Sequence, residues 1–196
     1  MSETSPQVII IAGPNGAGKT TLAPFLLRDE WGVLEYVNAD PIALGLSGFD
    51  PGSVAFDAGR VMLGRLHNLA AQRKTFAFES TLSAKSYATW IEKLRNDGYE
   101  FHSVFLWLRT ADLAVQRVRE RVRAGGHDVS EAIIRRRYHG GLKNFWQLQL
   151  YQPLANKWAV YDNSGASIPT MMAQGVGGET NIILSDYWRQ FLKVSK

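Results

Sequence analysis

The chain has 196 residues, of which 45% are hydrophobic and 20% are charged, as is typical of a globular protein with one core. It contains no cysteine, which excludes disulfides, thiolate catalysis and cysteine-based zinc sites. No apolar run is long enough to span a membrane, and residues 1–7 form a polar leader without the apolar region of a signal peptide. We therefore expect one cytoplasmic domain over residues 1–196.

The net charge of +4 is unevenly distributed, because arginines are concentrated between residues 109 and 137. Such a cluster is compatible with nucleic-acid binding, with a clamp on nucleotide phosphates, or with a solvated helix face. A solvated face is the expected role of most of these arginines. The cluster comprises Arg109, Arg117, Arg119, Arg121, Arg123, Arg135, Arg136 and Arg137.

The first predicted element is a buried strand over residues 8–12, followed by a glycine-rich segment and a helix over about 19–29. Residues 13–20 read GPNGAGKT and match the phosphate-binding P-loop motif G-x-x-x-x-G-K-[ST]. Lys19 is expected to contact the β- and γ-phosphates, and Thr20 to bind Mg²⁺. The motif predicts an ATP- or GTP-binding protein. The predicted nucleotide-binding residues are Gly13, Pro14, Asn15, Gly16, Ala17, Gly18, Lys19, Thr20 and Thr21.

A second strand is predicted over residues 33–38, and the chain after it is expected to be irregular as far as Gly52. Asp40 directly follows this strand, and Pro41 favours an extended conformation at Asp40. One interpretation is that Asp40 accepts the proton of a substrate hydroxyl during in-line phosphoryl transfer. The other is that Asp40 only begins a turn or caps a helix.

Glu79 ends a third predicted strand, over residues 75–78, which follows a helix over 53–74 capped by Ser53. A carboxylate there can bind a Mg²⁺-bound water or a substrate hydroxyl, or it can be a solvent-facing strand end. Thr81 is a candidate hydrogen-bond partner of the substrate. Because ligands of open α/β sheets bind beyond the carboxyl ends of the strands, we expect the P-loop, Asp40 and Glu79 to converge.

The rest of the chain continues to alternate helices and strands, which predicts an α/β fold with a parallel sheet. We therefore expect a kinase-type P-loop NTPase, a three-layer sandwich with a helical lid. The later predicted elements are a helix over 86–96, a strand over 101–108, a helix over 110–124 capped by Thr110, a helix from 130 to about 153, a strand over 158–161, a turn over 162–165, a short strand or loop, and a helix over 182–192.

The predicted lid covers residues 117–140, and its mobile tip is the segment 125–127. Arg123, together with Arg136 or Arg137, is expected to clamp the transferred phosphate, although a solvated helix face remains the alternative. Arg117 is a candidate for stacking on adenine. His127 is expected to hydrogen-bond within the loop rather than to act in catalysis.

The motifs GPNGAGKTT, NADPIA and FESTL, followed by a strand and an arginine-rich helix–lid–helix, resemble the zeta toxin family over about residues 7–165. The resemblance implies a P-loop kinase that phosphorylates the 3′-hydroxyl on the amino sugar of UDP-N-acetylglucosamine, using ATP or GTP and Mg²⁺. It also implies an antitoxin protein as a possible partner. It assigns the P-loop lysine to Lys19, the Mg²⁺ ligand to Thr20, the general base to Asp40, substrate contacts to Glu79 and Thr81, and catalytic lid arginines to Arg123 and Arg136.

The sequence departs from the zeta pattern at Ser83, where a basic substrate contact is expected, in its lid, and in lacking a long C-terminal extension. Two further hypotheses therefore stay open. The first is a kinase for another hydroxyl, such as that of an antibiotic, a sugar or a polynucleotide end. The second is a non-catalytic nucleotide-binding module, against which the absence of an NKxD switch motif argues. A nucleic-acid partner is disfavoured, because the arginines map to a lid without interleaved aromatics.

Overall fold

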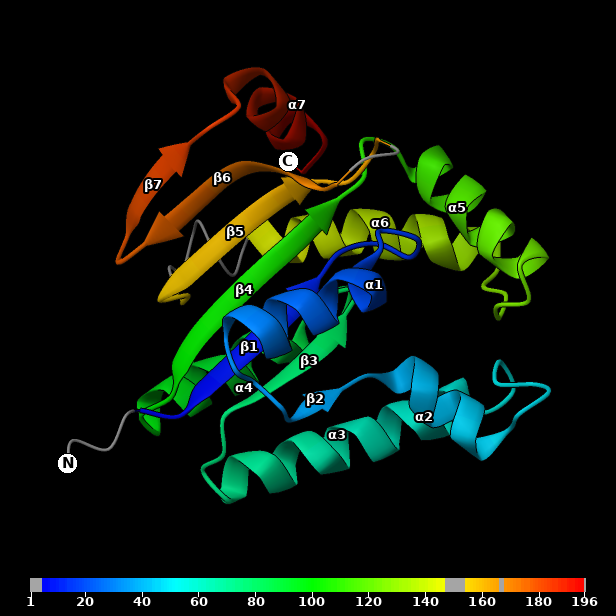
Figure 1. The fold of residues 1–196 in the computed structure, drawn as a ribbon, viewed down its shortest axis with the longest axis horizontal. Helices are drawn as coiled ribbons and strands as arrows, with labels where there is room; N and C mark the ends of the chain where they lie inside the picture. The colour runs from blue at the N-terminus through cyan, green and yellow to red at the C-terminus, as the bar shows by residue number, and fades with distance from the viewer. Residues whose placement is uncertain (1–4, 147–153, 166–167, 196) are drawn as a thin grey trace.

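The computed structural model describes residues 5–146, 154–165 and 168–195. The strands of this part of the chain form a seven-stranded sheet in the order β2-β3-β1-β4-β5-β6-β7, with helices on both faces (Figure 1). The strands are β1 (Gln7–Ala12), β2 (Tyr36–Val37), β3 (Phe76–Ser80), β4 (Glu100–Trp107), β5 (Lys157–Asp162), β6 (Thr170–Val176) and β7 (Glu179–Ile182).

The predicted α/β fold is confirmed, and β1 to β5 pair in parallel. The sheet differs from the expected one in that β6 and β7 extend it with antiparallel strands. Gly177 and Gly178 join these two strands with φ angles of 58° and 91°, the left-handed conformation that a tight hairpin turn requires. Antiparallel neighbours can be joined in this way, whereas a parallel pair needs a long crossover.

Most helices lie close to where the sequence places them. The helix predicted from residue 130 to about 153 corresponds to α6, and its predicted end, residues 147–153, lies outside the described part of the chain. The helices are α1 (Lys19–Ala23), which continues as the π-helical segment η1 (Pro24–Glu30), then α2 (Ala39–Leu46), α3 (Ala55–Ala71), α4 (Ser86–Asn96), α5 (Ala111–Arg123), α6 (Glu131–Trp146) and α7 (Ser185–Ser195). None of the described helices is long and apolar enough to cross a bilayer.

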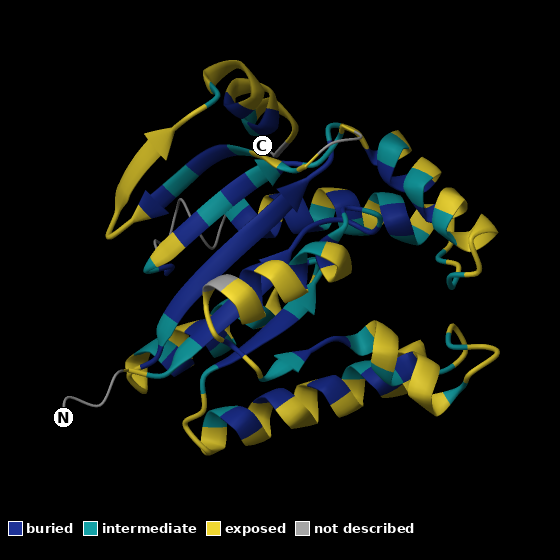
Figure 2. Cartoon of the chain, in the orientation of Figure 1, coloured by how far each residue is buried: buried dark blue, intermediate teal, exposed yellow. Residues whose placement is uncertain are grey.

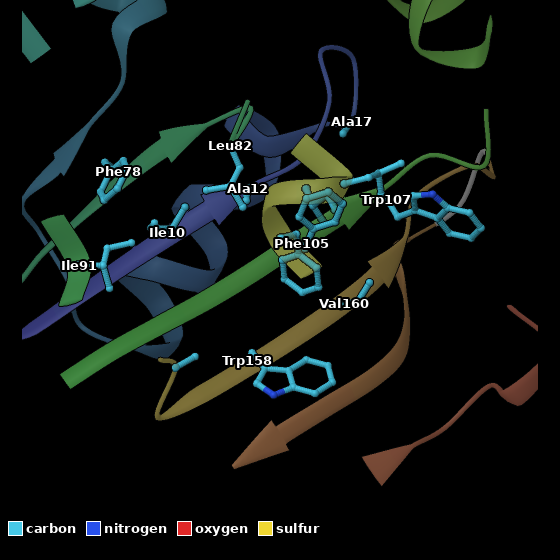
Figure 3. Close-up of a cluster of buried hydrophobic side chains, with 14 of the residues drawn as sticks. Ile10, Ala12, Ala17, Phe78, Leu82, Ile91, Phe105, Trp107, Trp158 and Val160 are labelled. Atoms are coloured by element: carbon cyan, nitrogen blue, oxygen red, sulfur yellow. The ribbon is translucent and has the colours of Figure 1, made fainter. Parts of the chain in front are cut away.

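The central strands are buried on both faces, as Figure 2 shows. On one face, Ile10 packs in a large cluster with Phe78 and Phe105, part of which Figure 3 shows. On the other, Ile9 and Ile11 pack with side chains of η1. An apolar run without alternation is what a strand covered by helices on both faces requires. This packing holds β1 rigidly behind the P-loop.

The segment expected to be irregular after the second strand contains α2, so this prediction was wrong. The side chain of Asn38 caps the helix by accepting a hydrogen bond from the backbone N–H of Asp40 at 2.9 Å. Pro41 lies in the first turn, where its missing N–H costs nothing. Asp40 is therefore helical rather than extended, and the first turn of α2 fixes its position.

The two predicted helix caps had different outcomes. Thr110 caps α5 as predicted, since its hydroxyl accepts a hydrogen bond from the N–H of Leu113 at 3.1 Å. Ser53 does not cap α3, because the residue at the cap is Val54. The Ser53 hydroxyl instead donates to the backbone oxygen of Asp50 at 2.8 Å.

Gly141→Ala is expected to destabilise the fold by about 1–3 kcal/mol, because overpacking forces backbone or side chains to shift. A Cβ at Gly141 in α6 would lie 2.3 Å from the carbonyl oxygen of Thr81. The matched control is Gly64→Ala in α3, where a Cβ meets nothing within 4 Å. Helix propensity predicts that this variant is about 0.5–1 kcal/mol more stable than wild type. Urea unfolding midpoints measure both, and equal midpoints would contradict the packing argument.

Candidate active site

The P-loop, residues 13–20, joins β1 to α1 and depends on glycine at three positions. Gly13, Gly16 and Gly18 have φ angles of 142°, 77° and 82°. A Cβ at Gly13 would lie 2.3 Å from the carbonyl oxygen of Leu106, and one at Gly18 would lie 2.8 Å from Nδ2 of Asn163. The loop is therefore packed tightly against the end of β4 and against the residue that follows β5, and these contacts restrict its shape.

Lys19 lies across its own loop and is only 6% exposed. Its Nζ donates a hydrogen bond to the carbonyl oxygen of Pro14 at 2.9 Å and lies 3.6 Å from Oε1 of Glu79. Burial lowers the pKa of Lys19, while the negative charges of Glu79 and Asp40 act to raise it. An incoming phosphate would add negative charge beside this buried ammonium group.

Glu79 lies at the centre of a hydrogen-bond network at the carboxyl end of β3. Its Oε2 accepts hydrogen bonds from Thr20 Oγ1 at 2.8 Å, Tyr36 OH at 2.8 Å and Asn38 Nδ2 at 2.9 Å. The Glu79 side chain is 9% exposed, so it is not a solvent-facing strand end. Burial, together with the Glu79 charge, raises the pKa of the Tyr36 hydroxyl. Tyr36 therefore acts as a neutral donor at this site.

Asp40 lies beside this network but stays open to solvent, with 47% of its side chain exposed. It is close enough to Lys19 to raise the pKa of that ammonium group. Its Oδ1 lies 3.7 Å from Nε2 of His127, which belongs to the loop between α5 and α6. The structure thus brings the P-loop, Glu79 and Asp40 together at the carboxyl ends of the parallel strands, with the lid loop touching Asp40.

The lid arginines divide between two sides of α5. Arg123 lines a groove with Arg119, Glu131 and Arg135, and no P-loop residue lines that groove. Arg121, two residues earlier and so about 200° away around the helix, lies near enough to Lys19 to lower its pKa. Arg121 therefore lies on the P-loop side of α5, whereas the role of Arg123 stays a prediction.

A similar division applies to α6, where Arg136 is exposed and its neighbour Arg137 is half-buried. Burial lowers the pKa of Arg137, and the nearby charge of Asp40 acts in the opposite direction. Arg137 thus lies on the side of α6 that faces Asp40. It is one of the two α6 arginines that the sequence offered as a phosphate clamp. The phosphate contact assigned to Arg136 stays a prediction.

Two other predicted residues lie near the site, with their roles untested. The Nη2 atom of Arg117 donates to the carbonyl oxygen of Gly165 at 2.8 Å, and its Cβ lies against Gly16 of the P-loop. The Thr81 and Ser83 hydroxyl oxygens are 3.0 Å apart and share a hydrogen bond. Stacking of Arg117 on adenine and substrate contact by Thr81 therefore stay predictions.

Sequence reasoning missed Asn163, which it treated as part of a turn. Its Nδ2 donates to the carbonyl oxygen of Ala17 at 2.8 Å and so ties the P-loop to the end of β5. The adjacent Asp162 accepts two hydrogen bonds from Arg109 that hold this turn in place. The signal in the sequence was that Asn163 lies two residues after a predicted parallel strand, where ligand-binding side chains of such sheets gather.

Asn163→Ala is expected to weaken ATP binding about fivefold, the equivalent of one lost hydrogen bond of about 1 kcal/mol. The loss should appear because the Ala17 carbonyl contact helps hold the loop in its binding shape. Isothermal titration with a non-hydrolysable ATP analogue measures this change, and Asn68→Ala on the exposed side of α3 is the control. Equal affinities for Asn163→Ala and wild type would remove Asn163 from the site.

The donor set fits a nucleotide and a Mg²⁺ ion. Oδ1 of Asn15 in the P-loop is buried and has no hydrogen-bond partner among the described residues. Thr20 and Glu79 supply hydroxyl and carboxylate oxygens, the ligand type that Mg²⁺ prefers. Within the described ranges, no cluster of three or more histidine, aspartate or glutamate side chains could hold a metal alone. Phosphate oxygens and water molecules would complete a Mg²⁺ site here.

Comparison with known proteins agrees with this fold. A family model described as an AAA domain matches residues 8–138. An uncharacterized protein of Haemophilus influenzae is 30% identical over 132 residues, which is 67% of this chain and 92% of that protein.

Solved structures also resemble the chain, at identities that show the fold alone. The complex AvrRxo1-ORF1:-ORF2 with ATP matches with a TM-score of 0.76 and 14% identity, over 96% of this chain and 64% of that one. The chain thus spans less than two thirds of that relative. The PezAT toxin–antitoxin system of Streptococcus pneumoniae matches with a TM-score of 0.66 and 15% identity, over 100% of this chain and 88% of that one.

Proposed function

The chain belongs to the AAA domain family of P-loop proteins, and from this premise we propose that it is an ATP-dependent kinase acting on a small-molecule hydroxyl. One observation carries the proposal: the half-exposed carboxylate of Asp40 lies close enough to the buried P-loop lysine to raise the pKa of that lysine. A nucleotide switch needs no exposed base next to the terminal phosphate. A kinase does, because the acceptor hydroxyl must lose its proton during the transfer.

In the proposed mechanism, the P-loop backbone and Lys19 bind the β- and γ-phosphates of ATP or GTP. Thr20 would hold Mg²⁺, which when bound neutralises charge on the phosphate oxygens, and Glu79 would bind a Mg²⁺-bound water or a substrate hydroxyl. Asp40 accepts the proton of the acceptor hydroxyl. The lid of residues 117–140 faces Asp40 across the site. Closure of this lid brings arginines towards the phosphates and excludes water, so that the acceptor rather than water is phosphorylated.

For the acceptor, we propose the 3′-hydroxyl on the amino sugar of UDP-N-acetylglucosamine. The order of the zeta-like motifs supports it, as does the likeness in fold to PezAT, which is named a toxin–antitoxin system. An antitoxin protein is then a possible partner of this chain. Glu79 and Thr81 would contact the sugar nucleotide. The hydrogen bonds that Glu79 accepts from Thr20, Tyr36 and Asn38 would hold its carboxylate in place for that contact.

A specific observation favours a second acceptor class. Where a zeta-like site is expected to carry a basic residue, Ser83 instead shares a hydrogen bond with Thr81. A neutral hydroxyl pair suits the hydroxyl groups of a sugar or an antibiotic better than a phosphate of a nucleotide sugar. A kinase for such an acceptor is therefore the alternative to be tested alongside UDP-N-acetylglucosamine.

The test is transfer of ³²P from [γ-³²P]ATP, first to UDP-N-acetylglucosamine and then to a metabolite extract. Label on the 3′-hydroxyl of the sugar nucleotide supports the first acceptor. Label only on other metabolites supports a kinase with a different acceptor and identifies that acceptor by mass. ATP binding without any labelled product would leave the non-catalytic module as the function.

A further inference from the structure

His127, at the tip of the lid loop, lies between a cation and a carboxylate. The Nη2 atom of Arg121 donates to the His127 carbonyl oxygen at 3.0 Å and lies 3.3 Å from Nε2 of the imidazole. The same Nε2 lies 3.7 Å from Oδ1 of Asp40, on α2. The Nε2 atom of His127 thus lies between a residue of α5 and the proposed base on α2.

The loop is shaped for this arrangement. A Cβ at Gly126 would lie 2.6 Å from Cγ of Arg121, so a larger residue there would push the arginine away from the loop. The His127 side chain is 25% exposed, which restricts its movement but leaves the ring accessible to water. The contact between Arg121 and His127 is therefore built into the lid and is not a chance meeting of two exposed side chains.

The two contacts of Nε2 exclude each other. A guanidinium group can only donate hydrogen bonds, so Nε2 serves Arg121 only as an acceptor, with the imidazole proton on Nδ1. A carboxylate only accepts, so Nε2 serves Asp40 only when it carries a proton. The 3.7 Å separation is slightly longer than a hydrogen bond, which matches a ring held by Arg121 and not yet by Asp40.

Arg121 also belongs to the nucleotide side of the site. Its charge lowers the pKa of Lys19, the residue expected at the β- and γ-phosphates. Its Nε is buried without a hydrogen-bond partner in the described part of the chain. A bound triphosphate would offer this arginine anionic oxygens, which are stronger acceptors than a neutral imidazole nitrogen.

We propose that His127 couples the nucleotide site to the acceptor site: its Nε2 accepts from Arg121 while no phosphate is bound, and donates to Asp40 once phosphates draw Arg121 away. The imidazole proton moves from Nδ1 to Nε2 through solvent, and no other reactant is needed. The new hydrogen bond holds Oδ1 of Asp40 and leaves Oδ2 for the acceptor hydroxyl. His127 is thus a positioning residue for Asp40, an inference that rests on the proposed kinase function.

The test uses the full chain labelled with ¹⁵N-histidine, in which the His127 signals are identified by their loss in His127→Gln. Without nucleotide, Nε2 is expected at the chemical shift of an unprotonated nitrogen. Addition of Mg²⁺ with the β,γ-imido analogue of ATP is expected to move it to that of a protonated nitrogen. In Asp40→Ala this movement should be lost, and in Arg121→Met the protonated form should already dominate without nucleotide.

The proposal is overturned if the chemical shift of His127 Nε2 does not change when the analogue binds, or if it is the same in Arg121→Met as in wild type. If the analogue does not bind at all, the proposed function fails, and the Arg121→Met arm still decides whether Arg121 controls the imidazole. Kinetics give a second readout: His127→Ala should lower kcat about tenfold, as expected for a lost hydrogen bond to a charged group. His127→Gln should recover part of kcat, because its amide can donate to Asp40.

The matched control is His139→Ala, which removes an exposed imidazole from α6 two residues from Arg137, on the other side of the helix. Its kcat should equal that of wild type. An equal fall of kcat in His127→Ala and His139→Ala would mean that both act only through lid stability, and would count against a positioning role.

Discussion

Asp40→Asn is expected to slow phosphoryl transfer by about 100- to 10,000-fold, the range typical of a lost general base. Asparagine has the same shape but cannot accept the acceptor proton. Affinity for ATP should be nearly unchanged, because the P-loop and Lys19 make the phosphate contacts and Asp40 lies on the separate helix α2. Single-turnover label transfer measures the rate, and titration with a non-hydrolysable ATP analogue measures the affinity.

The matched control for this variant is Asp57→Asn, an exposed aspartate in the first turn of α3. It removes the same charge from the neighbouring helix and is expected to retain wild-type turnover. Wild-type turnover in Asp40→Asn would remove Asp40 from its proposed role. A fall in ATP affinity as large as the fall in rate would instead make Asp40 part of the nucleotide site.

Lys19→Met is expected to abolish detectable ATP binding and to lower transfer by about 1,000-fold, as for loss of a preorganised charge at a transition state. The same change should leave the free energy of unfolding at pH 7 equal to that of wild type or higher. Burial lowers the pKa of Lys19, which means that its ammonium group is better solvated in the unfolded chain. Glu79 keeps its hydrogen bonds from Thr20, Tyr36 and Asn38 when the lysine is replaced.

The pH dependence of this stability difference has a definite sign. Because the folded-state pKa of Lys19 lies below the unfolded value of 10.5, charging Lys19 opposes folding at neutral pH. This penalty begins to fall as the pH rises through the lowered folded-state pKa, and it has disappeared above 10.5. The difference in the free energy of unfolding between Lys19→Met and wild type should therefore be smaller at pH 10 than at pH 7.

Urea unfolding of both proteins at the two pH values measures this gap. Lys93→Met, at an exposed position of α4, is the control and should show no pH-dependent gap. A Lys19→Met protein that is less stable than wild type at pH 7 would contradict the argument. It would mean that the ion pair with Glu79 outweighs the cost of burying the ammonium group.

The proposed site thus contains buried polar groups with which a nucleotide would pair. A buried ammonium group, an orphaned Asn15 oxygen and a buried Arg121 nitrogen all lie around the P-loop. Each of these buried groups lowers the stability of the nucleotide-free protein unless water or a bound phosphate pairs with it. Stability given up in this way at one place in the fold is typical of functional sites.

The sequence alone determined the phosphate-binding loop, because all of its parts lie within eight consecutive residues and glycine, lysine and threonine each have a local reason to be there. It also determined the strands β1, β3 and β4, whose apolar runs require burial on both faces. The convergence of Asp40 and Glu79 on the loop followed from the rule that parallel strands present their carboxyl ends at one edge.

Only the tertiary structure decided which side chains of that region meet. Asn163 reaches Ala17 across 146 residues of sequence, and His127 reaches Asp40 from the opposite wall. The choice between Arg121 and Arg123 depends on how α5 is rotated against the core, which spacing along one helix cannot reveal. Local rules describe a residue and its neighbours in the chain, whereas these contacts depend on how separate elements pack, and that is a property of the whole fold.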